Sequence, residues 1–246
     1  MHATYDGLIG TFGVVLARCK EAWKRRGLFG AITMMTRLLL QVLLTPLYYI
    51  TMGQKTFRYR GKAYRYFCHW YNTTFLNERA VEIAVALAML KKARGKRILE
   101  IGNVLSHYTD VTWQVLDKYE KGKGVINEDV VDFHPNERYD LIISISTMEH
   151  VGFDEHPKDA TKYSRAIENL KTLLAPGGSM FVTIPVGYNP DSVNDSCHTN
   201  LFETTQYLKH VSALRWEEVS KEEALQARFY YPYQFGNAVI FCMVNM

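Results

Sequence analysis

The stretch Arg97-Ile98-Leu99-Glu100-Ile101-Gly102-Asn103 decides the fold of this chain. A short apolar run ends in an acid and then a glycine, which is typical of a buried parallel strand that delivers the chain to a ligand. The glycine allows the backbone to turn sharply and to approach that ligand closely. Glu100 is thereby placed at the edge where open α/β sheets bind their ligands.

Two further buried strands follow along the chain. The run Tyr139-Asp140-Leu141-Ile142-Ile143-Ser144-Ile145-Ser146 predicts one of them, and residues 179–184 predict the other. Between them, residues 160–174 have the apolar spacing of a helix that ends at Ala175-Pro176-Gly177-Gly178.

At this point the chain resembles the class I S-adenosylmethionine-dependent methyltransferases, over residues 77–246. The matching pieces, in order, are Leu99-Glu100-Ile101-Gly102, Val115-Leu116-Asp117, Asp129, Tyr139-Asp140-Leu141-Ile142, Met148-Glu149-His150-Val151 and Leu174-Ala175-Pro176-Gly177-Gly178. The resemblance implies an α/β fold with a Rossmann-like, mostly parallel sheet and helices on both faces. It also implies that the last strand, residues 237–244, runs antiparallel beside its predecessor, and that the cofactor is S-adenosyl-L-methionine.

The chain departs from the family pattern around its second and third strands. Where the family has three glycines at alternate positions, this chain reads Gly102, Val104 and Ser106. Between Asp117 and Val125 there is no room for a helix, although parallel strands need a crossover of about a dozen residues or more. We therefore expect the third strand to be very short or displaced, and the sheet to be trimmed on that side.

The resemblance implies a set of cofactor-binding residues at the carboxyl ends of the strands. These are Glu100, Gly102, Asn103, Asp117, Glu128, Asp129, Ser144 and Ser146. Asp117 closes a strand and is placed to accept from the ribose hydroxyls, as an acid does in dinucleotide folds. Glu128 or Asp129 would lie near the adenine, and the two serines beneath the methyl group.

Candidate catalytic residues follow the fourth strand directly. The sulfonium of the cofactor is already activated, so an enzyme must hold donor and acceptor in line and, for a hydroxyl acceptor, remove a proton. Histidine titrates near neutral pH, which makes His150 a candidate base beside Glu149. The alternative is that this pair is structural. His156, Tyr188 and His198 are reserve candidates on loops.

Composition indicates a globular protein in a reducing compartment. The 246 residues are 48% hydrophobic and 22% charged. The cysteines are scattered without a CxxC pair, which favours free thiols and predicts no metal site. They are Cys19, Cys68, Cys197 and Cys242.

Charge and hydropathy divide the chain into three parts: a basic, apolar helical extension (residues 1–56), an aromatic and basic connecting segment (57–76) and the methyltransferase-like domain (77–246). The acids before Arg65 are Asp6 and Glu21, among many basic residues. This asymmetry predicts that residues 20–60 meet an anionic surface. We expect a cytoplasmic protein, peripheral on the membrane.

Residues 28–52 are nearly all apolar, with a polar stripe that recurs every four positions. The stripe consists of Thr33, Arg37, Gln41 and Thr45. The length is near the roughly 20 residues of a membrane span, but Arg37 and Pro46 oppose one. Three alternatives remain open: a helix in the membrane interface, a helix packed against its own domain or a dimer partner, and a true span.

Arginines alternate with aromatic residues in the connecting segment. They could stack sugar rings or bases, or form a hairpin around Gly61-Lys62; nucleic acid is not expected, because no RNA-binding motif accompanies them. A helix is predicted over residues 74–92, where Asn77-Glu78-Arg79 is either a solvated first turn or a wall of the cofactor pocket. Residues 186–196 are predicted to form a loop, residues 202–211 a helix and residues 213–219 a strand.

The sequence thus predicts a methyltransferase that acts on a hydroxyl of a saccharide or lipid-linked glycan at the membrane surface. The alternatives are a lipid or quinone methyltransferase, or a non-catalytic scaffold that retains the fold, as the depleted glycine loop suggests.

Overall fold

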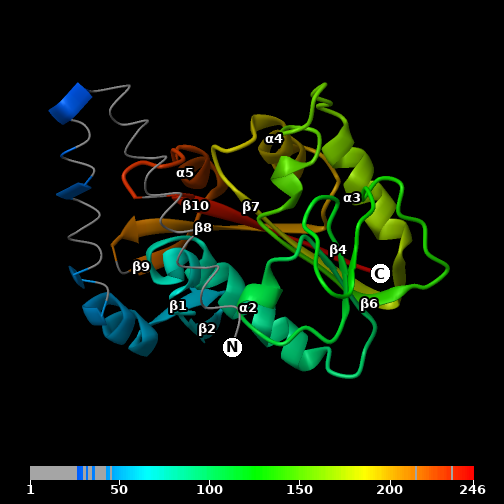
Figure 1. Cartoon of the computed structure of the whole chain (residues 1–246), viewed down its shortest axis with the longest axis horizontal. Helices are drawn as coiled ribbons and strands as arrows, with labels where there is room; N and C mark the ends of the chain where they lie inside the picture. The colour runs from blue at the N-terminus through cyan, green and yellow to red at the C-terminus, as the bar shows by residue number, and fades with distance from the viewer. Residues whose placement is uncertain are drawn as a thin grey trace.

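The computed structural model describes residues 27–29, 32, 35–36, 43–44, 46–213, 215–233 and 235–246. Its main sheet contains β3 (Ile98–Ile101), β4 (Gln114–Leu116), β5 (Val125–Ile126), β6 (Tyr139–Ile145), β7 (Leu174–Pro185), β8 (Thr204–Ser212), β9 (Arg215–Val219) and β10 (Ala238–Asn245). The eight strands lie in the order β5-β4-β3-β6-β7-β10-β8-β9 (Figure 1).

Strand direction in the sheet changes at β10. β5, β4, β3, β6 and β7 are parallel to one another, and β10 runs antiparallel between β7 and β8. The register pairs Ile101 with Leu116 on one side and with Ser144 on the other. The residues that follow these strands therefore emerge together at one edge of the sheet. The antiparallel last strand confirms the prediction for residues 237–244.

Helices cover both faces of the sheet. α3 (Lys162–Thr172), α4 (Pro190–His198) and α5 (Lys221–Leu225) lie on one face, and α2 (Arg79–Lys92) lies on the other (Figure 1). Apolar side chains fill the space between each layer and the sheet, for example Leu170 and Ile167 under α3 and Val81 and Ile83 under α2. Burial of each such side chain contributes about 1.5–3 kcal/mol. The helices predicted over residues 74–92 and 160–174 are confirmed, with shorter bounds.

The sheet is trimmed where the sequence predicted it. β4 has three residues and β5 has two. A single 3-10 turn, η2 (Leu105–His107), stands between β3 and β4, and β4 reaches β5 without a helix. The short loop after Asp117 still allows parallel pairing because only Val115 and Leu116 pair with Val125 and Ile126.

Two predicted segments differ from the structure. Residues 202–211 form strand β8 rather than a helix, since Thr204, Thr205 and Val211 are β-branched and the segment pairs with strands on both sides. Residues 186–196 contain helix α4 rather than only a loop. Its start follows from Asn189, whose side chain accepts from the amide of Asp191 at 2.9 Å, and from Pro190 in the first turn.

A hairpin joins the amino-terminal part to the sheet. Residues 46–54 are helical, and β1 (Thr56–Tyr59) pairs with β2 (Lys62–Arg65). The hairpin docks at β9, where the Trp216 amide donates to the Tyr66 hydroxyl at 2.8 Å. This confirms the hairpin predicted around Gly61-Lys62. A second 3-10 segment, η1 (Tyr71–Leu76), leads into α2.

The amino-terminal predictions fall largely on residues that the structure does not describe. Residues 1–26 and the polar stripe of Thr33, Arg37, Gln41 and Thr45 lie outside the described residues. Among the described helices, none is both long enough and apolar enough to cross a bilayer.

Candidate functional site

A cavity of about 390 Å³ lies beyond the carboxyl ends of β3, β4, β5 and β6. Its volume falls in the range of small-molecule sites. Five of the residues predicted for the site line it, namely Gly102, Asp117, Glu128, Asp129 and His150. The structure therefore brings together residues that span nearly fifty positions of sequence, as the resemblance implied.

Gly102 forms the floor of this cavity against Thr147. Its φ is +83°, and a Cβ at this position would lie 2.3 Å from Thr147 Oγ1. The loop after β3 and the loop after β6 are thus in direct contact through a glycine. The two glycines that the family pattern has at positions 104 and 106 are absent, yet the first one occupies a place that no other residue fits.

Glu100 organises the loop rather than lining the cavity. It is fully buried, and its Oε1 accepts from the amides of Val104 at 3.0 Å and Leu105 at 2.7 Å. Its Oε2 accepts from the Trp113 indole at 2.8 Å. Burial raises the pKa of Glu100, while these three hydrogen bonds act in the opposite direction. Glu100, which the resemblance implied as a cofactor-binding residue, therefore positions the loop after β3.

Asp117 ties three backbone amides into one loop. Its Oδ2 accepts from the Asn103 amide at 3.1 Å, and its Oδ1 accepts from Tyr119 at 2.9 Å and Glu120 at 2.7 Å. The Asn103 side chain donates to Glu120 at 2.8 Å and does not line the cavity. Oδ1 already accepts twice, whereas Oδ2 accepts once and has a further lone pair, so Oδ2 can still accept from a ligand hydroxyl.

Asp129 is engaged in an ion cluster on the cavity wall. Its Oδ2 lies 2.7 Å from Lys118 Nζ and 2.5 Å from Lys162 Nζ, and Glu155 contacts the same two lysines. Burial alone would raise the pKa of Asp129, but the two lysines outweigh it and lower the pKa. The exposed Glu128 has no such ion-pair partners among the described residues, and it lines the same cavity.

Ser144 of β6 and Ser146, the residue that follows β6, do not line the cavity. The hydroxyl of Ser144 is fully buried and donates to the Ile101 carbonyl at 3.1 Å. The hydroxyl of Ser146 donates to Glu82 Oε1 at 2.6 Å. Ser144 therefore fastens β6 to β3, and Ser146 fastens β6 to helix α2.

A buried charge cluster adjoins the cavity at the amino end of α2. Arg79 donates to the Ile145 carbonyl at 2.8 Å and lies 3.7 Å from Glu82 Oε2. Glu82 and Glu149 are 0% and 2% exposed, and each has an Oε2 atom without a hydrogen-bond partner among the described residues. Burial raises the pKa of Glu149 well above its usual range. Of the two interpretations of Asn77-Glu78-Arg79, the contact with the end of β6 favours a wall of the site.

His150 stands at the rim of the cavity with a carboxylate behind it. Its Nδ1 lies 2.5 Å from Asp154 Oδ2, and the Tyr188 hydroxyl donates to the same oxygen at 2.7 Å. Burial alone would raise the pKa of Asp154, but the hydrogen bonds from His150 and Tyr188 lower it. The Nε2 atom is 3.7 Å from Glu149 Oε1. An aspartate on Nδ1 fixes the imidazole so that Nε2 can accept a proton.

The structure adds residues that sequence reasoning missed. Thr147, Asp154 and Glu155 line the cavity, and Glu82 joins the buried cluster from helix α2. Thr147 and Asp154 lie within four residues of predicted positions, so closeness to the end of β6 was the available signal. No sequence signal pointed to Glu82, because its partner Ser146 lies 64 positions away in the chain. Of the reserve candidates, Tyr188 reaches the site through Asp154, whereas His198 contacts Lys221.

Comparisons with known proteins match solved methyltransferase structures. The N-methyltransferase NodS from Bradyrhizobium japonicum, in complex with S-adenosyl-L-homocysteine, is 15% identical, with 65% of this chain and 84% of that chain covered and a TM-score of 0.41. A SAM-dependent methyltransferase from Thermotoga maritima is 14% identical, with 71% of this chain and 94% of that chain covered and a TM-score of 0.42. The glycopeptide N-methyltransferase MtfA, in complex with S-adenosyl-L-homocysteine, is 10% identical over 66% and 88%, with a TM-score of 0.33. No protein-family model and no curated protein matches the chain.

The fold class rests on the sheet of this chain itself. A parallel half is followed by an antiparallel strand inserted between β7 and β8, and the cavity lies at the switch-point edge where such sheets bind ligands. The strand order β5-β4-β3-β6-β7-β10-β8 therefore gives this chain the fold of the class I S-adenosylmethionine-dependent methyltransferases.

Proposed function

We propose that this chain is an S-adenosylmethionine-dependent methyltransferase that methylates a hydroxyl of a saccharide or lipid-linked glycan at a membrane surface. The observation that carries the proposal is the His150–Asp154 pair, with Nδ1 and Oδ2 2.5 Å apart at the rim of the cavity above Gly102. A hydroxyl acceptor needs a base at this position, whereas a scaffold needs none.

The residues that line the cavity fit the ribose and adenine of the cofactor, and the buried charge cluster lies beyond that lining. Asp117 and Glu128 offer carboxylate oxygens to ribose hydroxyls and to an adenine amino group. Arg79 offers a guanidinium to a carboxylate, and the Oε2 atom of Glu82, which lacks a hydrogen-bond partner within the described residues, suits an ammonium group. Buried polar atoms without partners are costly, so a ligand that satisfies them gains affinity.

The chain's own residues would perform two tasks in the reaction. When bound, S-adenosylmethionine supplies an electrophilic methyl group on a sulfonium. The contact of Gly102 with Thr147 fixes the floor, so that an acceptor can be held in line. His150 Nε2 would take the hydroxyl proton, while the Asp154 carboxylate stabilises the imidazolium.

An aromatic cluster beside Arg79 supports a saccharide acceptor. Tyr71 stacks on His107 with ring centroids 4.4 Å apart, and Tyr108 meets both rings edge-on. Burial raises the pKa of Tyr108, and nearby Arg79 opposes that shift. Flat rings and phenolic hydroxyls next to the methyl-donor end suit the faces and hydroxyls of a sugar.

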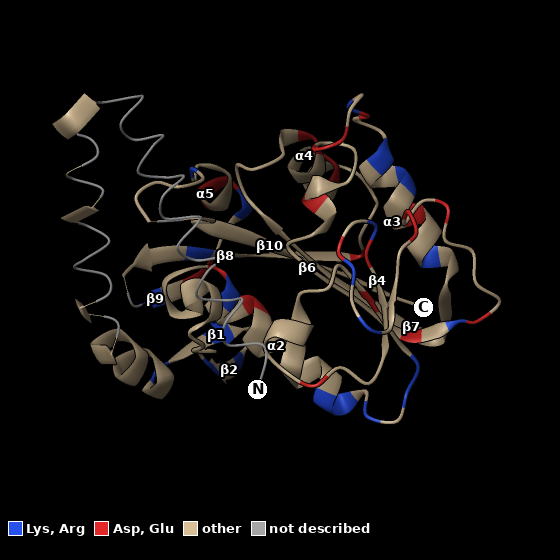
Figure 2. Cartoon of the chain, in the orientation of Figure 1, with Lys and Arg blue, Asp and Glu red and all other residues tan. Residues whose placement is uncertain are grey.

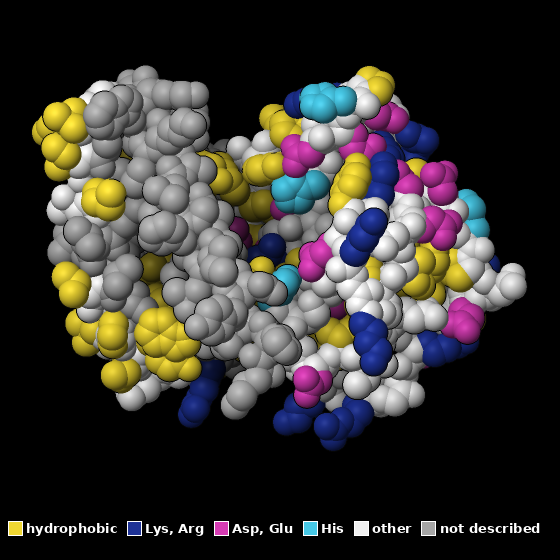
Figure 3. All heavy atoms as spheres, in the orientation of Figure 1, with side chains coloured by type: hydrophobic (Ala, Val, Ile, Leu, Met, Phe, Trp, Pro, Cys, Tyr) yellow, Lys and Arg dark blue, Asp and Glu magenta, His cyan; other side chains and the backbone are white. Residues whose placement is uncertain are grey.

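Exposed apolar residues support the proposed association with a membrane surface. Leu43, Leu47 and Ile50 are 73%, 59% and 60% exposed, and Trp70, which stacks on Tyr49, is 58% exposed. Figure 3 shows hydrophobic side chains gathered at the lower left, where Figure 1 places the helix of residues 46–54. Apolar residues next to the exposed Arg58 and Arg65 of the hairpin suit an anionic membrane interface.

The test is methyl transfer from tritiated S-adenosylmethionine to a glycolipid fraction of cell envelopes. We expect the label in released sugars as an alkali-stable methyl ether, and we expect His150→Asn to abolish it. Label lost on alkaline hydrolysis would indicate an ester, and label recovered in an amine would indicate N-methylation; either result would overturn the hydroxyl assignment. Failure of the wild-type protein to bind the cofactor would overturn the methyltransferase assignment itself.

A further inference from the structure

A second cavity, of about 420 Å³, lies at the other end of α2, away from the carboxyl ends of the strands. The hairpin, the last turn of α2 and the starts of β6 and β7 enclose it. Four basic residues line it, namely Arg60, Lys62, Lys92 and Lys96, with the two tyrosines Tyr59 and Tyr64. Figure 2 shows Lys and Arg on the hairpin and on the end of α2 with the loop that follows.

The positive charges around this cavity are not neutralised within the described residues. Asp140 is the acid in its lining, and its Oδ2 accepts from the Arg97 amide at 2.9 Å and lies 3.9 Å from Arg97 Nε. Lys62, Lys92 and Lys96 form no ion pair within the described part of the chain. Like charges held around one space repel each other unless an anion joins them.

Arg60 carries the strongest sign of a ligand. Its guanidinium Nη1 lies 2.9 Å from the Met243 sulfur, a weak acceptor, and contacts no carboxylate among the described residues. A guanidinium is the group that proteins use for bidentate binding of phosphate. The side chain is therefore held at the cavity, and most of its donors have no protein partner among the described residues.

The backbone at Arg60 is also unfavourable for an arginine. Arg60 has φ of +51° and Gly61 has φ of +70°, so both central residues of this two-residue turn are left-handed. Turns of this kind favour Asn, Asp or Gly at the first position. The Glu218 carboxylate holds the strained turn by accepting from the Arg60 amide at 2.7 Å. Strained backbone positions occur preferentially at ligand-binding and functional sites.

We propose that this cavity binds a phosphate group, carried either by a lipid headgroup or by a soluble phosphate ester. Lysines near a helix C-terminus also stabilise its dipole, which accounts for Lys92. That explanation does not extend to Arg60 and Lys62, which belong to the hairpin and reach the same space. The Tyr59 hydroxyl, which donates to the Met243 sulfur at 3.8 Å, adds a neutral polar group to the same space.

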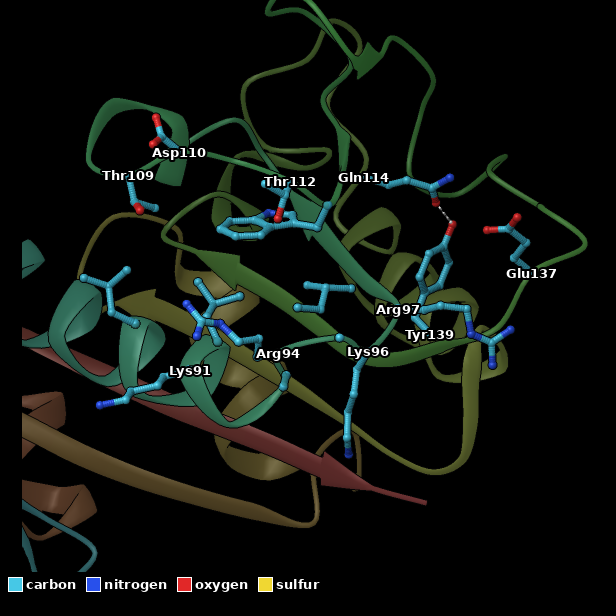
Figure 4. Close-up of a pocket in the computed structure, with 16 residues that line it drawn as sticks. Lys91, Arg94, Lys96, Arg97, Thr109, Asp110, Thr112, Gln114, Glu137 and Tyr139 are labelled. Carbon is cyan, nitrogen blue, oxygen red and sulfur yellow. Dashed lines mark hydrogen bonds between the residues drawn. The ribbon is translucent and has the colours of Figure 1, made fainter.

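A neighbouring groove of about 840 Å³ is a weaker candidate for phosphate binding. Its basic residues Lys91, Arg94, Lys96 and Arg97 share the lining with two acids, Asp110 and Glu137, whereas the smaller cavity has one. Figure 4 shows Lys96 extending away from Thr112 and Gln114 of this groove. Lys96 also lines the smaller cavity, where it adds to a charge that acids do not balance.

The test uses the full chain and the variant Arg60→Asn, which removes the charge and places a favoured residue in the turn. Binding of inorganic pyrophosphate is measured by calorimetry, and binding to phosphatidylcholine vesicles with or without phosphatidic acid by flotation. We expect Arg60→Asn and Lys92→Gln each to weaken phosphate binding by about tenfold, the loss of one charge-assisted contact. The melting temperature of Arg60→Asn should equal or exceed that of the wild type.

The arms of the experiment identify the source of the phosphate. Binding of pyrophosphate indicates a soluble ester, and binding only of vesicles with phosphatidic acid indicates a lipid headgroup; either supports the site when Arg60→Asn weakens it. The control Lys121→Gln/Lys123→Gln removes two exposed charges from another loop and should bind as the wild type does. Absence of binding, or equal losses in the control and in Arg60→Asn, would overturn the proposal.

Discussion

Gly102 and Thr147 touch across the floor of the cavity so closely that a Cβ on Gly102 would lie 2.3 Å from Thr147 Oγ1 and 2.5 Å from its methyl carbon. The two residues follow neighbouring parallel strands, β3 and β6. This contact keeps the loops that would flank the donor sulfur in one position. It also explains how a loop with one glycine in place of three can retain its shape.

Gly102→Ala should therefore unfold or distort the cavity floor. Gly124 provides a matched control, because it has the same φ of +83° and, among the described residues beyond its chain neighbours, no atom would lie within 4 Å of a Cβ there. Gly124→Ala should lower the free energy of unfolding by about 1–2 kcal/mol, the cost of a left-handed backbone for alanine. Gly102→Ala should lower it by a further ~1–3 kcal/mol, because the added methyl group also overpacks the contact with Thr147. Urea denaturation of both variants measures the difference; equal losses of unfolding free energy would show that the contact is not tight.

His150→Ala should lower turnover by about 10²–10⁴-fold and leave cofactor affinity nearly intact, if the imidazole acts as the base. Asp154→Asn should lower turnover less, because it leaves the imidazole in place but removes its 2.5 Å partner. Wild-type activity should fall as pH decreases, since an imidazolium cannot accept a proton. A folded His150→Ala variant with normal turnover would remove the histidine from the mechanism.

Acid should destabilise the protein through His210, which is 5% exposed and lies between Trp216 and Tyr233. Burial lowers its pKa from 6.5 to about 4. Between these values the unfolded chain binds a proton that the folded chain does not, so the free energy of unfolding falls as pH drops below about 6.5. This part of the loss should reach roughly 2–3 kcal/mol near pH 4.5.

His210→Phe isolates that contribution, because it keeps a ring between Trp216 and Tyr233 without a titrating group. Denaturation of both proteins at pH 7.5 and pH 4.5 should show a smaller acid loss in the variant. The same acid loss in both proteins would mean that other groups cause it.

Replacing Leu43, Leu47 and Ile50 with Ser should release the protein from anionic liposomes without unfolding it, since all three are exposed. Each side chain withdrawn from an apolar interface is worth about 1.5–3 kcal/mol. Met246→Ser, at a residue 63% exposed elsewhere, is the control and should still float. If the triple variant unfolds while the wild type fails to float, this segment packs against protein instead.

The sequence predicted the sheet because its signals are local. The buried run at Ile98–Ile101 fixes a strand by composition alone, and the short distance from Asp117 to Val125 predicted the trimming. The turn predicted at Ala175-Pro176-Gly177-Gly178 is wrong, because these residues lie inside strand β7. β8 was predicted wrongly, since pairing with β9 and β10 on both sides decides its conformation and a single segment does not reveal its partners.

Part of the candidate site was also predicted from local signals in the sequence. Gly102, Asp117 and His150 follow strands directly, so their position along the chain placed them at the cavity. The roles of Glu100 and Glu82 depend on three-dimensional contacts, with Trp113 and with Ser146, that have no signature in sequence. Asp129 lies at the cavity as predicted, but its carboxylate is paired with Lys118 and Lys162. Glu128 is therefore the better candidate for contact with the adenine.

Calorimetry with S-adenosylmethionine, on the wild-type chain and on Asp117→Asn, tests the central claim most directly. We predict saturable one-to-one binding by the wild type. Affinity should be about 10–100-fold weaker in the variant, because an amide nitrogen replaces one of the carboxylate oxygens, which accept from Asn103 and Tyr119 and which we propose bind the ribose. Wild-type affinity in the variant would show that the cofactor does not meet Asp117. Absence of any binding to the folded wild type would contradict the account as a whole.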